Sequence, residues 1–420
     1  MPQPATPMTQ PVAPTLAPPP VGANRRRLDA VDALRGLACL MVMLHHTFGQ
    51  MPVPGHEFGQ QPIPSGFWHY PSVLLLRVAA AGWLGVSLFL ALSGFCLFYP
   101  LAARGRLRLD LADFARRRAR RILPPYYIAL LLLSVLELAW YWHGPGGLRW
   151  RDALASDGGA RQHLRDAALH LLMLHNLSRS SLASVNPAFW SLALECQLYV
   201  LFPLLVWGAA RWGMRAVLAA TLPVAVAWQY LCFRHLGLTM QWTPELAAHY
   251  HALPGRCFEF AAGMAAAALV ARPRPGQARA ALLLLVLLLP PLLWFVLHVS
   301  RFGPGVDPAW GVVSAAALVL ACAAPLRWFE RPLLGRGLVR LGAISYSVYL
   351  VHQPLILILS PRLLHLPVGL RADFLTGLLR IPLLIAVGYG FHLLFERPFM
   401  PGRPRTGRQA EVAAAVSPAP

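Results

Sequence analysis

Apolar segments long enough to cross a bilayer recur along the whole chain, and this recurrence is what most constrains its fold. A membrane-spanning α-helix needs about 20 predominantly apolar residues. The 420 residues are 57% hydrophobic and only 13% charged, against about 25% charged in a soluble domain. We therefore predict an all-α membrane helix bundle with about ten transmembrane helices. The predicted spans are residues 29–50, 80–99, 122–142, 189–210, 214–233, 246–271, 281–298, 309–325, 339–360 and 373–395.

The loop arginines predict the orientation of these spans. Loops on the side of the N-terminus contain 24 arginines, whereas loops on the other side contain 10. Cytoplasmic loops carry an excess of basic residues, so we expect both termini in the cytoplasm and the protein in the cytoplasmic (inner) membrane of a bacterium. Segment 163–176 stays open as an interfacial helix, a re-entrant helix or an eleventh hydrophobic element.

The two ends of the chain differ from the rest in composition. Residues 1–24 contain eight prolines and no charged residue, a composition that cannot bury a core. We expect disordered cytoplasmic tails at residues 1–27 and 401–420. Residues 28–400 then form one membrane domain.

The basic charge and the cysteines each exclude a class of chemistry. The formal net charge is +20 and all 37 basic residues are arginine, which rules out a lysine nucleophile or Schiff base. Because these arginines sit in short loops of alternating sides, we read the charge as a topology signal and expect the lipid bilayer, not nucleic acid, as the partner. The six cysteines all fall in apolar stretches without metal-ligand spacing, so we expect neither disulfides nor a metal site.

The first span carries charged and titratable residues at membrane depth, where they are costly and often functional. Arg35 and His46 are eleven residues apart, which places them on nearly the same helix face and about 16 Å apart along its axis. Asp32 precedes Arg35 by three residues and can pair with it. His45 points about 100° away from His46. The sequence alone leaves a functional and an interfacial role for His46 equally open.

Two further stretches are candidates for binding and catalysis. Five arginines precede Pro124 at the start of the third span, a density suited to phosphate as well as to orientation. Glu195 lies within the fourth span, with Ser191 and Tyr199 one turn away on the same face. A carboxyl group there should face the bundle interior and have a partner.

Two later polar clusters are weaker signals. Arg256 and Glu259 are three residues apart near a span entrance, which a structural salt bridge explains adequately. Tyr346, Tyr349 and His352 follow at three-residue steps. This ladder fits either hydrogen bonds between helices or the lining of a substrate path.

Taken in order, these stretches resemble the acyltransferase-3 family of integral-membrane O-acyltransferases over about residues 28–400. Individual motifs are weak to moderate, and their shared order makes the resemblance strong. The departures are Cys196-Gln197 after Glu195, where the family usually has an acidic or glutamine pair, and the lack of a fused hydrolase-like domain. The matching segments are DALRGLA with His46, GVSLFLALSGF, RRARRILPPYY, FWSLALECQLYVLFP, LGAISYSVYLVHQPL and the terminal FERP.

The resemblance implies acyl transfer from cytosolic acyl-CoA, commonly acetyl-CoA, to a hydroxyl of a carbohydrate or glycosylated acceptor. Histidine titrates near neutral pH and can take the hydroxyl proton, so His46 is the expected general base. Glu195 and Arg35 complete the expected catalytic set. The expected donor-binding residues are Arg117, Arg118, Arg121 and Tyr126, and the expected substrate-binding residues are Trp190, Ser191, Tyr199, Tyr349 and His352.

Two other functions use the same residues. Intramembrane charges also line transport paths, so a transporter or flippase for glycolipid or polysaccharide is the main alternative. The third is a membrane sensor or assembly protein that has lost activity. The sequence does not identify the acceptor or the acyl length.

Overall fold

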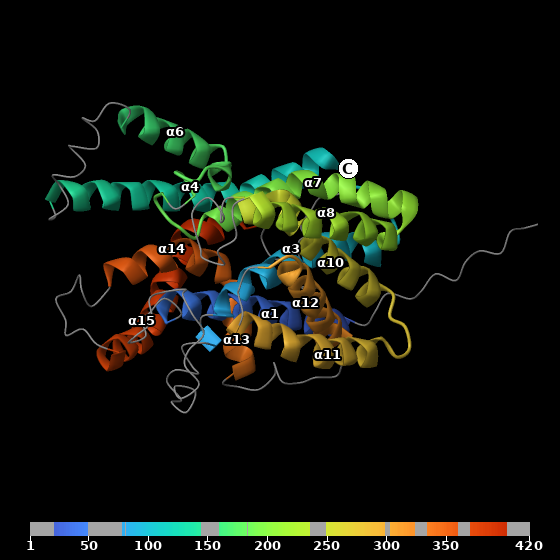
Figure 1. Cartoon of the computed structure of the whole chain (residues 1–420). Coiled ribbons are helices and arrows are strands. Elements are labelled where there is room, and N and C mark those ends of the chain that lie inside the picture. The colour runs from blue at the N-terminus through green and yellow to red at the C-terminus, as the bar shows by residue number, and fades with distance from the viewer. Residues whose placement is uncertain are drawn as a thin grey trace, which may run out of the picture.

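The computed structural model describes residues 21–48, 78–79, 81–143, 159–182, 184–235, 249–298, 303–323, 334–359 and 370–400 (Figure 1). Every regular element within these ranges is helical, which confirms the all-α prediction. The elements are α1 (Val21–Thr47), η2 (Ala81–Trp83), α3 (Leu84–Ala103), α4 (Leu111–His143), α6 (Gly159–Leu171), η3 (His175–Leu177), α7 (Trp190–Trp212), α8 (Met214–His235), α10 (Leu253–Ala271), α11 (Gln277–His298), α12 (Val306–Ala323), α13 (Leu334–Ala343), α14 (Ser345–Ile358), α15 (Leu370–Phe391), η5 (His392–Glu396) and η6 (Arg397–Phe399).

Among the described residues, seven helical segments are long and apolar enough to cross a membrane by length and composition. They are α3 together with η2, and α4, α7, α8, α10, α11 and α15. The other three predicted spans correspond to α1, which contains several charges, to the 18-residue α12 and to the 14-residue α14. The count of ten spans and the cytoplasmic termini therefore remain predictions.

Several predicted boundaries differ from the structure, and the largest difference is at α4, which begins at Leu111 and not at residue 122. The predicted span 339–360 is two helices, because α13 ends at Ala343 and the Ser345 hydroxyl donates to the Gly342 carbonyl at 2.9 Å before α14 continues. α10 begins at Leu253, where Pro254 suits a first helical turn. α1 begins at Val21, beyond the last proline of the predicted tail. Residues 1–20, the tail 401–420 and the first FERP segment lie outside the described ranges.

Segment 163–176 does not form a spanning helix. α6 has 13 residues, which reach about 20 Å and cannot cross a hydrocarbon core of about 30 Å. Leu164 and Leu171 are exposed on it, whereas His170 is fully buried. The length of α6 excludes a spanning helix, and the interfacial and re-entrant alternatives stay predictions.

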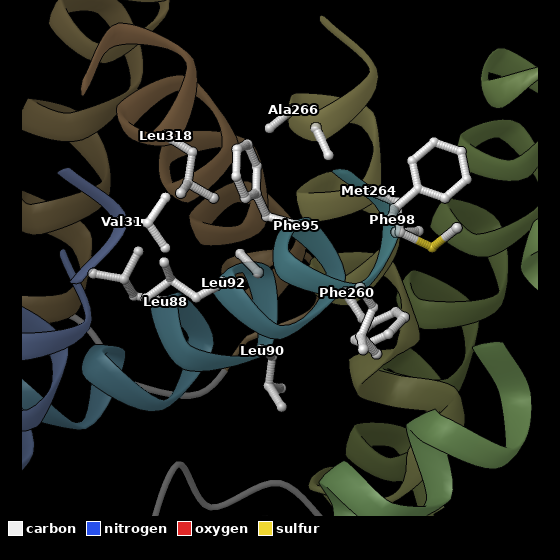
Figure 2. Packing of buried hydrophobic residues seen from close by; sticks show 14 of the residues in the cluster. Val31, Leu88, Leu90, Leu92, Phe95, Phe98, Phe260, Met264, Ala266 and Leu318 are labelled. Carbon is white, nitrogen blue, oxygen red and sulfur yellow. The ribbon is translucent and has the colours of Figure 1, made fainter. Parts of the chain in front are cut away.

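The central packing is between α3 and α10, the most extensive helix pair of the bundle (Figure 2). Leu92, Phe95, Phe260 and Met264 meet in its core. Small residues make this approach possible: a Cβ on Gly94 would collide with the Phe260 carbonyl. In lipid the hydrophobic effect does not drive helices together, so helices associate through close packing, which small residues such as glycine allow.

α1 is held against α13 in the same way. A Cβ on Gly36 would strike the Leu338 carbonyl, and one on Gly342 would strike the Asp32 carbonyl. This contact fixes the rotation of α1, and with it the direction in which Arg35 points. In contrast, many leucines of α11 are exposed, as expected for a helix on the lipid-facing side.

Candidate active site

Five helices, α1, α3, α4, α7 and α14, enclose a cavity of about 120 Å³. Each of the polar segments identified in α1, α4, α7 and α14 contributes to its wall. Ser191 and Tyr199 lie about 12 Å apart along α7, so the cavity extends along the helices. Its polar lining residues are Arg35, Ser93, Cys96, Arg118, Arg121, Ser191, Glu195, Tyr199, Ser345, Tyr346 and Tyr349, and its apolar ones are Val86, Phe89, Leu90, Leu92, Leu97, Ile122 and Leu192.

Glu195 is the acceptor of a compact hydroxyl cluster in the middle of the cavity. Its Oε1 accepts from Ser93 Oγ at 2.9 Å and from Tyr199 OH at 2.5 Å. Helical spacing explains the second bond, since residues four apart share a face. Glu195 is partly buried, lines the cavity and has Tyr199 as a partner, and Ser93 joins it from α3.

Three arginines form a positive end of the cavity. Arg35 donates through Nη1 to Asp32 at 2.6 Å and through Nη2 to Cys96 Sγ at 3.3 Å. Arg118 and Arg121 of α4 line the same space. The Nε atom of Arg118 is buried without a hydrogen-bond partner among the described residues. This end therefore has guanidinium groups with hydrogen-bond donors available for an anion.

The opposite end carries a pair of hydroxyls. Ser191 Oγ and Tyr349 OH are 2.6 Å apart. Each hydroxyl also lies within hydrogen-bond distance of the Ala188 carbonyl oxygen. Pro354 lacks an N–H and so leaves the Leu350 carbonyl free of its usual helical partner. Asn186 Nδ2 donates to that carbonyl at 3.1 Å, which docks the start of α7 on α14.

His46 lies beyond this hydroxyl end and is not a wall residue of the cavity. Its Nδ1 is 2.9 Å from Nε2 of His352. The His352 ring in turn packs against the Tyr349 ring at 5.2 Å between centroids. The elongated cavity thus extends from Arg35 to Tyr349, whose ring contacts the histidine pair. The ring of Phe89 packs against Tyr349 at the same end.

Three of the predicted binding residues point elsewhere. Tyr126 is fully buried and its hydroxyl contacts Nδ1 and the carbonyl of His170, both at 3.2 Å. Arg117 is exposed and pairs with Asp113. Trp190 precedes Ser191 and so points about 100° away from it. Its ring stacks on His251 at 4.3 Å between centroids, outside the cavity.

The neighbours of Tyr126 form a histidine pair in the connection between α4 and α7. The rings of His170 and His175 are stacked at 4.0 Å, and both are fully buried. Burial lowers the pKa of His170 to about 4 and that of His175 to about 3, because a charged imidazole loses its hydration there. Both are therefore neutral at pH 7 and serve packing.

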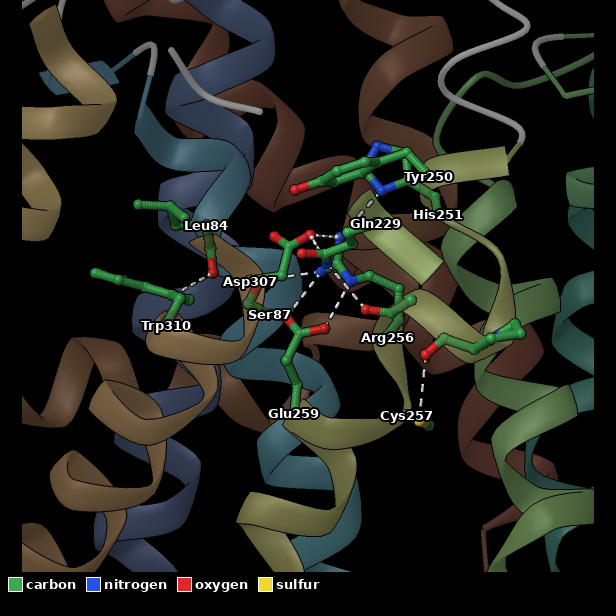
Figure 3. A network of polar contacts seen from close by, with 12 residues as sticks. Leu84, Ser87, Gln229, Tyr250, His251, Arg256, Cys257, Glu259, Asp307 and Trp310 are labelled. Carbon is green, nitrogen blue, oxygen red and sulfur yellow. Dashed lines mark hydrogen bonds and ion pairs between the residues drawn. The ribbon is translucent and has the colours of Figure 1, made fainter. Parts of the chain in front are cut away.

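A second charged cluster lies between α3, α8, α10 and α12 (Figure 3). Arg256 binds Glu259 through Nε at 2.6 Å and Nη2 at 3.0 Å, and Ser87 through Nη2 at 3.0 Å. Its Nη1 reaches His251 at 3.0 Å and Asp307 at 3.5 Å. The guanidinium thus makes four hydrogen bonds and a further ion-pair contact with Asp307. This matches the structural reading of the Arg256–Glu259 pair.

Cys96 lines the cavity although the sequence interpretation gave it no site role, whereas Tyr346 belongs to the tyrosine and histidine ladder for which the lining of a substrate path was one of two alternatives. Cys96 was grouped with the buried apolar thiols, but it is only partly buried. A usable signal was the three-residue step from Ser93 to Cys96, which puts both on one face of α3. Tyr346 donates to the Ile122 carbonyl at 2.8 Å and joins α14 to α4.

Comparison with known proteins gives one family. The family model described as "Acyltransferase domain" matches residues 28–397. Acyltransferase MdmB of Streptomyces mycarofaciens is 28% identical over 370 residues, which are 82% of this chain and 87% of MdmB. Peptidoglycan O-acetyltransferase OatA of Listeria monocytogenes is 22% identical over 355 residues, or 80% of this chain and 51% of OatA. No solved structure matches significantly.

The chain spans about half the length of two of these relatives. Besides OatA, it covers 50% of YrhL of Bacillus subtilis, at 26% identity over 366 residues. The aligned region in both cases is about 80% of this chain. The helices that line the cavity lie almost wholly within residues 28–397, the segment that the family model matches.

Proposed function

The chain belongs to the acyltransferase family whose domain covers residues 28–397, and from this membership we propose that it transfers an acyl group from acyl-CoA to a hydroxyl group of a carbohydrate or glycosylated acceptor. Acetyl is the acyl group that the name of OatA suggests. The inner membrane is the proposed location, with the arginine-rich loops in the cytoplasm.

One observation carries this proposal. A single cavity has arginines at one end and hydroxyl groups next to a histidine pair at the other. Acyl-CoA has the same polarity, with phosphates at one end and a reactive thioester at the other. Between the two ends the wall combines leucines of α3 and α7 with the Glu195 hydroxyl cluster, which suits a linking arm that carries methylene and amide groups.

Arg118 and Arg121 are proposed to bind the donor phosphates. Arginine binds phosphate oxygens by charge-assisted, often bidentate hydrogen bonds. Arg35 supports the same end of the cavity and is held in place by Asp32 and Cys96. Arg117 and Tyr126 were expected beside them, but they lie outside the cavity and have no part in this proposal.

His46 is proposed as the general base. It takes the proton of the acceptor hydroxyl as that oxygen attacks the thioester carbonyl carbon. The carbon–oxygen bond forms, the carbon–sulfur bond breaks, and the CoA thiolate then takes the proton back from His46. Ser191 and Tyr349 supply hydroxyl groups where the acyl group would sit, while Glu195 orients Ser93 and Tyr199 in the wall.

The acceptor is proposed to be a cell-envelope carbohydrate. Peptidoglycan is the acceptor that the printed name of OatA gives for that protein, and it is the first acceptor to test here. A transporter of glycolipid or polysaccharide remains the competing function, and the requirement for acyl-CoA separates the two.

The test is acyl transfer by the full-length protein in proteoliposomes, with radiolabelled acetyl-CoA and peptidoglycan fragments. We expect label in the carbohydrate, and a loss of about 10²–10⁴-fold on His46→Ala, the usual contribution of a general base. His392→Ala is the matched control, because His392 binds Glu396 and does not line the cavity. Full transfer by His46→Ala would remove the base assignment, and no acyl-CoA-dependent labelling of any carbohydrate would overturn the function.

A further inference from the structure

We propose that His352 is a positioning residue that fixes the tautomer of His46, so that the Nε2 atom of His46 carries the lone pair that accepts the proton. This inference rests on the proposed function and assigns a different role to His352 from the substrate binding expected from sequence. Its basis is a chain of two hydrogen bonds that starts at a backbone carbonyl of α14.

The first bond sets the proton on His352. Its Nδ1 is 2.7 Å from the carbonyl oxygen of Tyr349, one turn earlier on α14. A carbonyl oxygen can only accept, so Nδ1 of His352 must carry a hydrogen. Nε2 of the neutral ring is then an acceptor.

The second bond passes this constraint to His46. Nε2 of His352 is 2.9 Å from Nδ1 of His46, and because Nε2 accepts, Nδ1 of His46 donates. The neutral His46 ring therefore has its hydrogen on Nδ1 and its lone pair on Nε2. The hydrogen bond on one imidazole nitrogen commonly decides the state of the other.

His352 has no nitrogen left for a substrate. Both of its nitrogens are used, and its side chain is fully buried. His46 is only partly buried and uses one nitrogen in this chain of bonds. The two histidines thus have distinct roles: His352 orients His46, and the Nε2 atom of His46 is available to accept a proton.

The arrangement keeps the reaction balanced. When His46 Nε2 takes the hydroxyl proton, its Nδ1–H remains bonded to neutral His352, which stabilises the imidazolium until Nε2 returns the proton to the thiolate. His352 gains and loses nothing overall. A serine-protease triad uses a buried carboxylate for the same orientation, whereas here a neutral ring on a backbone carbonyl does so without a buried negative charge.

Two titratable side chains of the described residues contact the His46 ring. They are His352 on α14 and His45 on the same helix as His46. The His45 and His46 rings meet edge to face at 5.1 Å between centroids. Neither neighbour is a carboxylate, so the orientation of the His46 ring rests on its hydrogen bond to neutral His352.

The direct test reads the tautomer without measuring activity. Solid-state ¹⁵N NMR of histidine-labelled protein in lipid, with the His46 signals assigned by difference from His46→Gln, should show His46 protonated on Nδ1 at neutral pH. His46 protonated on Nε2 instead would overturn the proposal. This readout stays valid even if no acyl acceptor is found, so its failure and that of the proposed function are distinct.

A kinetic test compares two substitutions of His352. His352→Leu removes the acceptor, so kcat should fall about 10- to 100-fold, as for lost outer-shell partners, with both KM values nearly unchanged and the acid limb of the kcat profile at lower pH. His352→Gln offers an amide oxygen to His46 Nδ1 and should recover most of kcat. Equal loss in both variants, or a KM effect alone, would contradict positioning. Should His352→Leu fail to fold, the NMR measurement still decides.

Discussion

The two charged clusters of this bundle have nearly the same sequence pattern but differ in burial: one is closed off from solvent and the other lines a cavity. Asp32–Arg35 and Arg256–Glu259 are both acid–base pairs at a spacing of three. The Arg256 side chain has 0% exposure and is held by four hydrogen bonds, whereas the Arg35 side chain has 21% exposure and lines a cavity. A buried charge with all its partners holds helices together, and one beside open space is available to a ligand.

The chemistry of the two surroundings explains the difference. Asp307, Gln229 and Ser87 reach Arg256 or its partners from three other helices, so the ion pair there is closed on all sides (Figure 3). Around Arg35 the other helices bring Cys96, a weak acceptor, and the arginines of α4. Repulsion between these arginines would be relieved by an anion, as in the proposed binding of the donor phosphates.

The largest expected effect is on stability, from Arg256→Met. Removing one partner of a buried network leaves uncompensated carboxylates, which costs about 3–5 kcal/mol. Arg35→Met should cost only about 1 kcal/mol, because its pair with Asp32 is partly exposed, yet should reduce acyl transfer strongly. Thermal unfolding in detergent, followed by size-exclusion chromatography, measures the stability of both variants, and the acyl-transfer assay measures their activity. If Arg256→Met unfolds like the wild type while transfer is lost, the second cluster belongs to the active site.

The helical period accounts for what the sequence could predict. It placed Ser191, Glu195 and Tyr199 on one face of α7, and the structure has all three on the cavity wall. The same period explains why neighbouring Trp190 points away. The all-helical fold followed in the same way from apolar length.

The rest depends on the rotation and contacts of whole helices, which local patterns do not contain. The break at Ile344 depends on Gly342 packing against α1, a contact between segments far apart in the chain. Arg117 and Arg121 are one turn apart on α4, and only the position of α1 and α3 decides that Arg121 lines the cavity. Likewise, nothing in the sequence told the open Arg35 pair from the closed Arg256 pair.

The next effect in size compares two arginines of α4. Arg121→Ala should raise the KM for acetyl-CoA about 10-fold or more, since a hydrogen bond to a charged group is worth about 1.5–3 kcal/mol, and should change the acceptor KM little. Arg117→Ala is the matched control, because Arg117 is exposed and pairs with Asp113. Steady-state kinetics with each substrate varied measures the split. Equal effects of both substitutions would mean that the arginines act through net charge, not through the cavity.

The smallest effect comes from removing one hydroxyl oxygen in each of two tyrosines. Tyr199→Phe loses the 2.5 Å bond to Glu195 in the cavity wall, so transfer should fall several-fold while stability changes by about 1 kcal/mol or less. Tyr126→Phe removes the hydroxyl group that donates to the carbonyl of buried His170 and contacts its Nδ1, which should lower stability by about 1–3 kcal/mol and leave transfer per folded molecule unchanged. Unfolding temperature and specific activity are measured on the same samples. A reversed result, with Tyr126→Phe impairing transfer and Tyr199→Phe only stability, would put the active site on the α6 side of α4 and refute the assignment of the cavity.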